Sequence, residues 1–258
     1  MLLAIDVGNT HTVFGVWDGA RWAAVWRRGT NPAATEDQLA VWLRGAFDLS
    51  GIEFKVDGVI CASVVPPAND PVERLARRWF GIEPFFIHGG ADLGLEVRYD
   101  PPTAVGADRL ANALAALAEH KPPIIVVDFG TATTFDAICA DGSYCGGAIM
   151  PGVVVSSQAL IKRAAQLPQV EFTAPEKALG QSTVESLQSG IMFGYAGAID
   201  HLAKAISKEL GGKAKVIATG GLGRLFVELC SSIECYEPNL TLDGLRIAYE
   251  RISARRGP

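Results

Sequence analysis

One pattern occurs twice in the chain, and it constrains the fold more than any other feature of the sequence. Residues 2–10 read LLAIDVGNT, and residues 124–131 read IIVVDFGT. Each is an apolar run, which predicts a strand, followed by Asp-x-Gly and a small polar residue, which predict a tight turn. Because the two copies lie about half a chain apart, they favour a duplicated domain with a nucleotide held between the halves.

The first turn has the chemistry of a magnesium and phosphate site. The carboxylate of Asp6 suits a metal ion, bound directly or through water, and Gly8 has no Cβ, so backbone N–H groups can approach phosphate oxygens. The competing interpretation is a hairpin in which Asp6 and Asn9 satisfy only local backbone groups. The second copy, at Asp128, makes a nucleotide site the stronger interpretation.

The hydrophobic pattern predicts an α/β protein whose halves share the element order β-β-β-α-β-α-β. In the first half the expected strands are 2–6, 12–17, 21–28, 56–63 and 84–87, and the expected helices are 35–48, 69–79 and 103–119. In the second half the expected strands are 124–128, 131–139, 143–149, 215–218 and 233–236, and the expected helices are 153–166, 183–210, 222–230 and 240–252. Lys121-Pro122-Pro123 is the predicted hinge, which gives domains at 1–120 and 121–258.

Two more stretches are candidates for chemistry. Asp108 and Arg109 stand near the start of an Ala-rich helix, where Asp108 can accept a proton from a hydroxyl nucleophile and Arg109 can bind an anionic group of the same substrate. The alternative is structural, since the helix dipole favours an acid in the first turn. Thr219-Gly220-Gly221, between a strand and a helix, permits close approach of a flat ligand such as adenine or is a plain β–α turn.

Charge, hydropathy and cysteine content exclude several classes of protein. The net charge of -5 gives no support to nucleic-acid binding through a general positive field. No apolar run approaches the ~18–20 residues that cross a bilayer, and the N-terminus lacks the features of a signal peptide. The five cysteines include no Cys-x-x-Cys pair and their number is odd, so we expect a cytoplasmic protein without a disulfide framework or a metal knot.

The motifs resemble, in their order, those of type III pantothenate kinases, a family of the acetate and sugar kinase/Hsc70/actin superfamily. The matching stretches are Asp6–Thr10, Gly106–Arg109, Asp128–Thr133 and Thr219–Gly221. The Asp-x-Gly and Thr-Gly-Gly motifs are shared across the superfamily. More specific are Gly-Ala-Asp-Arg after Tyr99-Asp100-Pro101, and Gly180–Thr183 followed by Ser189-Gly190. The resemblance extends from Leu2 to about Tyr249 and implies two duplicated ribonuclease H-like domains, each an actin-like ATPase domain, with the active site in the cleft between them.

The resemblance also implies a reaction and a set of site residues. The reaction transfers phosphate from ATP to pantothenate, the first step towards coenzyme A, in a homodimer whose partner subunit helps to enclose pantothenate. Asp108 is the implied proton acceptor, Asp128 the ligand of a monovalent cation (K⁺ or NH₄⁺), and Asp6 the residue that holds Mg²⁺ through water. The implied pantothenate contacts are Tyr99, Gly106, Ala107, Asp108, Arg109 and Thr183. The implied ATP contacts are Asp6, Val7, Gly8, Asn9, Thr10, His11, Thr12, Val13 and Thr131.

Two other functions stay open on the sequence. One is a non-catalytic accessory or regulatory protein on the same fold, against which the three carboxylates of Asp6, Asp108 and Asp128 argue, because a pure scaffold has no need of them. The other is a kinase of a different small hydroxylated acid or sugar.

Overall fold

The computed structural model describes residues 1–164 and 166–256. They form two compact units. The first contains residues 1–95 and 99–115 together with the C-terminal helix, and the second contains residues 96–98 and 116–239. None of the helices in the described ranges is both long and apolar enough to cross a membrane.

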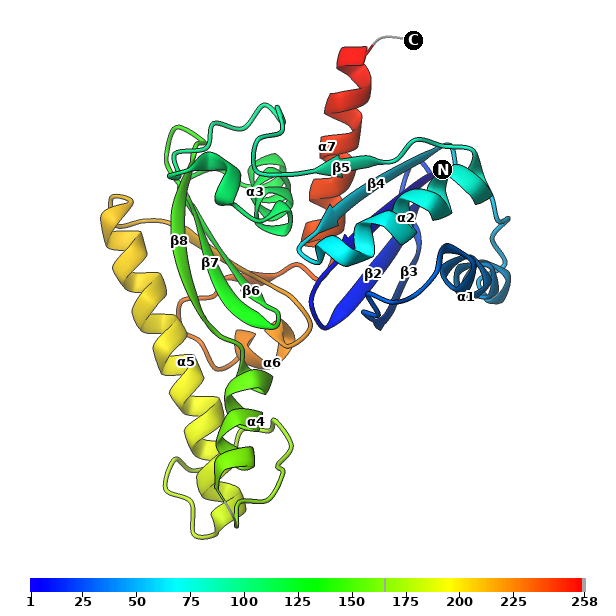
Figure 1. Ribbon diagram of the computed structural model, residues 1–258. Coiled ribbons are helices and arrows are strands. Elements are labelled where there is room, and N and C mark those ends of the chain that lie inside the picture. Colours follow the sequence, from blue (N-terminus) through cyan, green and yellow to red (C-terminus); the bar gives the residue numbers. More distant parts are fainter. Residues whose placement is uncertain (165, 257–258) are drawn as a thin grey trace. The chain divides into compact units, whose positions relative to one another are not determined.

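The first unit is built on a five-stranded mixed sheet (Figure 1). Its strands are β1 (Leu2–Val7), β2 (His11–Trp17), β3 (Trp22–Gly29), β4 (Gly58–Ser63) and β5 (Phe85–Ile87), in the order β3-β2-β1-β4-β5. The first three strands form an antiparallel meander, whereas β4 is parallel to β1 and β5 is parallel to β4. The central strand β1 is buried along most of its length, which explains its continuous apolar sequence.

Helices cover the first sheet. They are α1 (Glu36–Leu49), α2 (Asn69–Leu75), which continues as a π-helical turn (Ala76–Phe80), and α7 (Leu240–Arg256). Helix α3 (Ala107–Glu119) packs on α7, where Gly244 lies against the Ala111 backbone, and its residues 116–119 belong to the second unit. Helix α1 begins with the predicted capping box, in which the Gln38 N–H donates to Thr35 Oγ1 at 3.3 Å and the Thr35 N–H donates to Gln38 Oε1 at 3.0 Å. Its apolar stripe, with Leu43 and Phe47 completely buried, packs into the core of the sheet.

Helix α7 joins the first unit although it comes last in the chain. It packs on β1 and β4. Gly58 lies directly under the Tyr249 ring, where a Cβ would overlap the ring, and Trp22 Nε1 donates to Asp243 Oδ1 at 2.8 Å. The predicted domains, 1–120 and 121–258, place this helix with the second half of the sequence, so the compact units and the predicted domains group it differently. The domain boundary itself stays a prediction.

The second unit repeats the topology of the first. Its strands are β6 (Ile124–Phe129), β7 (Ala132–Ile138), β8 (Tyr144–Pro151), β9 (Lys215–Thr219) and β10 (Cys235–Tyr236), in the order β8-β7-β6-β9-β10. Again the first three strands are antiparallel and the last two are parallel. Helices α4 (Val153–Arg163), α5 (Thr183–Glu209) and α6 (Gly223–Val227) complete the unit, and α4 packs against α5 (Figure 1). The predicted α/β fold with two duplicated ribonuclease H-like domains is confirmed.

Some predicted elements differ from the observed ones. The helix expected from residue 103 starts at Ala107, because Pro102–Ala104 form a separate 3₁₀ turn and Val105 has an extended backbone. Helix α6 is shorter than the predicted 222–230 and β10 shorter than the predicted 233–236. The helix predicted for 153–166 ends at Arg163, and part of its predicted end, Ala165, lies outside the described residues, as do Gly257 and Pro258 of the predicted second domain.

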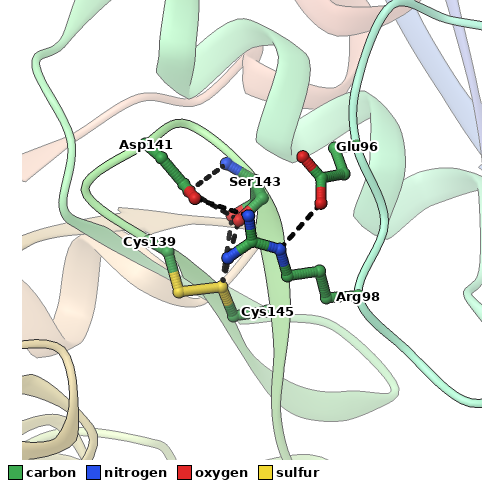
Figure 2. Close-up of a disulfide and its surroundings, with 6 residues drawn as sticks. All are labelled: Glu96, Arg98, Cys139, Asp141, Ser143 and Cys145. Carbon is green, nitrogen blue, oxygen red and sulfur yellow. Dashed lines mark hydrogen bonds and ion pairs between the residues drawn. A yellow bond between two sulfur atoms is a disulfide. The ribbon is translucent and has the colours of Figure 1, made fainter.

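The chain contains one disulfide, although its cysteine pattern predicts no disulfide framework. Cys139 and Cys145 form a disulfide across the hairpin that joins β7 to β8 (Figure 2). The two residues lie six apart in the sequence, and the hairpin turn at Asp141-Gly142 brings them together. Cys61, Cys230 and Cys235 are free thiols. An odd count with no Cys-x-x-Cys pair excluded a framework of several bridges, but it carried no information on one bridge within a hairpin.

Candidate active site

The turn between β1 and β2 is held by a compact set of hydrogen bonds. The Gly8 N–H donates to the His11 carbonyl at 3.0 Å, and Thr30 Oγ1 donates to the Gly8 carbonyl at 2.6 Å. Thr12 and Thr30 share a hydrogen bond of 2.9 Å between their hydroxyls. These contacts fasten the turn to the end of β3 and leave Asn9, Thr10 and His11 exposed to solvent. The half-buried Asp6 is the fifth residue of β1, immediately before this turn.

The turn between β6 and β7 repeats this arrangement in the second unit. Asp128 is the fifth residue of β6 and is half-buried, as Asp6 is in β1. The Gly130 N–H donates to the Ala132 carbonyl at 3.0 Å, and the Gly152 N–H donates to the Thr131 carbonyl at 3.1 Å. Two strand-end carboxylates therefore occupy equivalent positions in the two sheets, which is the arrangement that the repeated motif predicted.

The Thr219-Gly220-Gly221 turn lies against the Asp128 carboxylate. Strand register pairs Asp128 with Thr219, and a Cβ on Gly220 would lie only 2.5 Å from Asp128 Oδ1. Gly220 also has a φ of +86°, which favours glycine. Tyr236 Oη donates to the Gly220 carbonyl at 3.0 Å and so fixes the turn from its other side. Only glycine allows the backbone this close to Asp128.

A buried hydroxyl lies on β7, the strand that follows the turn between β6 and β7. Thr133 is 1% exposed, and its Oγ1 has no hydrogen-bond partner among the described residues. Its backbone pairs with Phe129, next to Asp128. Because Asp128 pairs with Thr134, its side chain lies on the opposite face of the sheet from Thr133, so this hydroxyl is not a neighbour of the Asp128 carboxylate.

Asp108 lies in the first turn of α3, where the local backbone shapes its surroundings. The Arg109 N–H donates to Asp108 Oδ1 at 2.9 Å, and a Cβ on Gly106 would lie 2.5 Å from the same oxygen. Burial raises the pKa of Asp108, although the hydrogen bond and the positive charge of Arg109 act in the opposite direction. A carboxylate with a raised pKa is a better proton acceptor than an exposed one, provided that it is still ionised. The Arg109 side chain is itself 8% exposed.

Tyr99 follows a segment that is tied to the β7–β8 hairpin. The Tyr144 N–H donates to the Glu96 carbonyl and the Arg98 N–H donates to the Tyr144 carbonyl, both at 2.8 Å. The Arg98 guanidinium bridges Glu96 and Asp141, with N–O distances of 2.8 and 2.6 Å (Figure 2). Hydrogen bonds from the hydroxyl and N–H of Ser143, together with Arg98, hold the pKa of Asp141 at about 2. The segment directly before Tyr99 is therefore fixed to the hairpin that carries the disulfide.

The stretch from Gly180 to Ser189 starts helix α5. Ser182 caps the helix through its hydroxyl, which accepts from the Glu185 N–H at 3.2 Å, and Gly180 packs on the Ser186 backbone more closely than a Cβ allows. Ser189 Oγ donates to the Ala178 carbonyl at 2.6 Å. These contacts give a structural role to the motif's glycine and serines, while Thr183, the first helical residue, is exposed.

The predicted site residues divide between the units. The first unit contains Asp6–Val13, Tyr99 and Gly106–Arg109, and the second contains Asp128, Thr131 and Thr183. Within the second unit the structure adds Gly220, which belongs to the Thr-Gly-Gly motif but is not among the predicted site residues. The signal for Gly220 was the Gly pair after a predicted strand, and the parallel register of β6 and β9 identifies its neighbour.

Comparison with known proteins identifies the family. A family model described as type III pantothenate kinase matches residues 2–205. Type III pantothenate kinase of Myxococcus xanthus is 45% identical over 252 residues, covering 97% of this chain and 98% of that protein. Type III pantothenate kinase of Geobacter sulfurreducens is 44% identical over 252 residues, covering 97% of this chain and 99% of that protein.

Solved structures at low identity show the same fold. A conserved putative Baf family transcriptional activator from Campylobacter jejuni superposes with a TM-score of 0.62 at 20% identity, over 97% of this chain and 98% of that one. MreB 5 of Spiroplasma citri superposes with a TM-score of 0.57 at 11% identity, over 99% of this chain and 97% of that one. The ROK hexokinase of Thermus thermophilus superposes with a TM-score of 0.52 at 14% identity, over 99% of each chain. The fold is that of the actin-like ATPases and sugar kinases, and the chain belongs to the type III pantothenate kinase family.

Proposed function

We infer that this protein is a pantothenate kinase, which uses ATP to phosphorylate pantothenate to 4′-phosphopantothenate in the first step of coenzyme A biosynthesis. The observation that carries this inference is identity of 43–46% to five type III pantothenate kinases, along 97–98% of the chain. The three carboxylates at strand ends and at a helix start supply the groups that a phosphoryl transfer needs.

We propose Asp108 as the proton acceptor for the pantothenate hydroxyl. Its raised pKa brings its basicity closer to that of a useful general base, and its Oδ1 is oriented by the Arg109 N–H. Tyr99, Gly106, Ala107, Arg109 and Thr183 complete the proposed pantothenate contacts. Arg109 is the group suited to the pantothenate carboxylate, because a guanidinium binds carboxylates through paired hydrogen bonds.

The two glycine turns are the proposed ATP contacts, and their residues fit phosphate and Mg²⁺. Exposed backbone at Asn9–His11, exposed Thr131 and the half-buried Asp6 offer N–H donors, a hydroxyl and a carboxylate. Asp6 would hold Mg²⁺ through water, and the metal when bound supplies positive charge to the phosphates. Few lysines accompany these turns, so backbone amides and cations have to neutralise ATP.

Asp128 is the proposed ligand of a monovalent cation, K⁺ or NH₄⁺. One observation supports it: Gly220 leaves room for the close approach of its backbone to the carboxylate. Carboxylate, hydroxyl and carbonyl oxygens suit a hard cation. A bound cation would add positive charge next to the Asp128 carboxylate.

We also propose that the protein is a homodimer. Several large apolar side chains between β8 and the start of α5 are exposed, which is unfavourable unless another surface covers them. They are Ile149 (64%), Val154 (37%), Val155 (43%), Leu160 (47%), Leu179 (81%) and Val184 (44%). A second copy of the chain is the proposed partner, and Thr183 is next to one of these residues, Val184, in the sequence.

The function is tested by measuring ADP release from ATP with Mg²⁺ and K⁺, with pantothenate and then with a panel of small hydroxylated acids and sugars. We expect turnover that depends on pantothenate. Turnover with another member of the panel alone would contradict pantothenate as the substrate. ATP binding without turnover of any acceptor would instead favour the accessory role on the same fold.

A further inference from the structure

Three side chains with metal-binding atoms meet in the second unit, and none of them is assigned to catalysis. His120 follows the last turn of α3, Cys235 lies in β10, and Glu237 follows β10. One ligand atom from each lies within 4.8 Å of the other two, and all three residues are half-buried.

The backbone holds two of these residues in fixed positions. Cys235 and Glu237 are two residues apart in extended chain, so their side chains lie on the same face. The Glu237 N–H donates to the Ala218 carbonyl at 2.8 Å, and Thr219 Oγ1 donates to the Glu237 carbonyl at 2.7 Å. His120 continues the hydrogen bonding of α3, since its N–H donates to the Ala116 carbonyl at 2.9 Å.

We propose that His120, Cys235 and Glu237 bind a zinc ion, with a water molecule as the fourth ligand. A thiolate, an imidazole and a carboxylate are the donors that Zn²⁺ takes in proteins, and a mixed set excludes the hard cations Mg²⁺ and Ca²⁺. The proposal does not depend on the kinase function, because none of the three residues belongs to the proposed substrate contacts.

The present distances are close to those that a tetrahedral ion requires. Zinc bonds of about 2.0–2.3 Å place neighbouring ligand atoms roughly 3.3–3.6 Å apart. Cys235 Sγ lies 3.8 Å from Glu237 Oε1, near this range. His120 Nε2 lies 2.5 Å from the same oxygen, so these two side chains have to separate by about 1 Å, which side-chain rotation permits.

Zinc binding changes the protonation of two ligands and the position of a neighbouring lysine. Zinc binds the Cys235 thiolate, so the thiol proton passes to solvent, and it binds His120 through Nε2, so the imidazole proton has to sit on Nδ1. Lys215 Nζ now lies 2.9 Å from Nδ1 and has to turn towards solvent. Glu234 and Glu237 contribute negative charge near Cys235, whereas Lys215 opposes the ion.

A metal here would tie an edge strand to a helix. Strand β10 pairs with β9 at two positions only, Cys235 with Ile217 and Tyr236 with Ala218. Two of the three ligands come from β10 and the residue that follows it, and the third comes from the end of α3. Bound zinc would therefore stabilise the least extensively paired strand of the second sheet.

The test is a Co²⁺ titration of the metal-free full chain, without reductant, followed by the absorption of the thiolate–cobalt charge-transfer band. We expect one equivalent of Co²⁺ to bind and Zn²⁺ to displace it. Cys235→Ser should remove the band, and His120→Gln should weaken binding at least 10-fold. The matched control is Cys230→Ser, which removes a free thiol that is not one of the three proposed ligands and should keep the band.

Lys215→Met gives an independent test that leaves all three ligands in place. Removing the opposing positive charge should tighten Co²⁺ binding by roughly 10-fold. Zn²⁺ should also raise the Tm of the wild-type protein and of Lys215→Met. A band that persists in Cys235→Ser, an affinity unchanged in Lys215→Met, or no binding of either metal would each overturn the proposal.

Discussion

At the scale of single residues, Asp108 combines a proposed catalytic role with a cost in stability. Burial favours its neutral form in the folded state, and its pKa is therefore higher than in the unfolded chain. A group with a raised pKa contributes stability below its unfolded pKa and loses that contribution as pH rises through the folded pKa. At a pH above its folded pKa the buried carboxylate is ionised and its burial opposes folding.

Asp108→Asn should therefore raise the Tm at neutral and alkaline pH, and the gain should shrink as the pH is lowered through the folded pKa, because the wild-type carboxyl then becomes neutral. The measurement is thermal unfolding of both proteins across this pH range. Asp200→Asn is the comparison of opposite sign. Burial raises the pKa of Asp200, but hydrogen bonds from Ser232 and Ser231 outweigh it and hold the value at about 2, so this change should lower the Tm at pH 7. A lower Tm for Asp108→Asn than for the wild type at pH 7 would contradict the predicted direction of the change in Tm.

Gly220 offers a second residue-scale prediction. Gly220→Ala introduces a Cβ at positive φ and 2.5 Å from Asp128 Oδ1, so we expect loss of stability and a rise in the K⁺ concentration that gives half-maximal activity. Gly211→Ala is a matched control, because Gly211 has a φ of +97° and no neighbour near its Cβ position. It should lose stability through backbone strain alone. An equal effect of the two changes on K⁺ dependence would count against a cation site at Asp128.

At the scale of elements, the disulfide closes the β7–β8 hairpin that anchors residues 96–98. Its loop is short, and the chain-entropy relation gives a contribution of about 2 kcal/mol for it. A reductant such as dithiothreitol should therefore lower the Tm of the wild-type protein and leave that of the Cys139→Ser/Cys145→Ser double variant unchanged. A Tm in the wild type that does not respond to reductant would show that the bridge contributes nothing to the free energy of unfolding.

Much at this scale could be predicted from the sequence. Strands 2–6 and 124–128 are buried apolar runs, and the Thr35–Gln38 spacing identified a helix start, because both patterns are local. The disulfide and the contact of Gly220 with Asp128 could not be predicted, since each depends on which residues a hairpin or a parallel register brings together. The motifs identified Asp6, Asp108 and Asp128 as candidate site residues. Which substrate or ion each of them binds stays a prediction.

At the scale of the whole molecule, the exposed apolar side chains of residues 149–184 underlie the proposed dimer. Val155→Glu should convert it to a monomer, because a carboxylate cannot be buried there without a partner. The control is Val41→Glu on α1, which changes a valine that is 72% exposed in the first unit and should leave the mass unchanged. Light scattering after size-exclusion chromatography gives the mass. A monomeric wild-type protein would contradict the proposal.

The most direct test of the central claim is the kcat of Asp108→Asn with pantothenate and ATP, measured beside a binding titration of both substrates. If Asp108 accepts the proton of the pantothenate hydroxyl, kcat should fall by about 100-fold or more while the substrates still bind and the protein stays folded. A kcat equal to that of the wild type would contradict the role of Asp108 and the mechanism built on it.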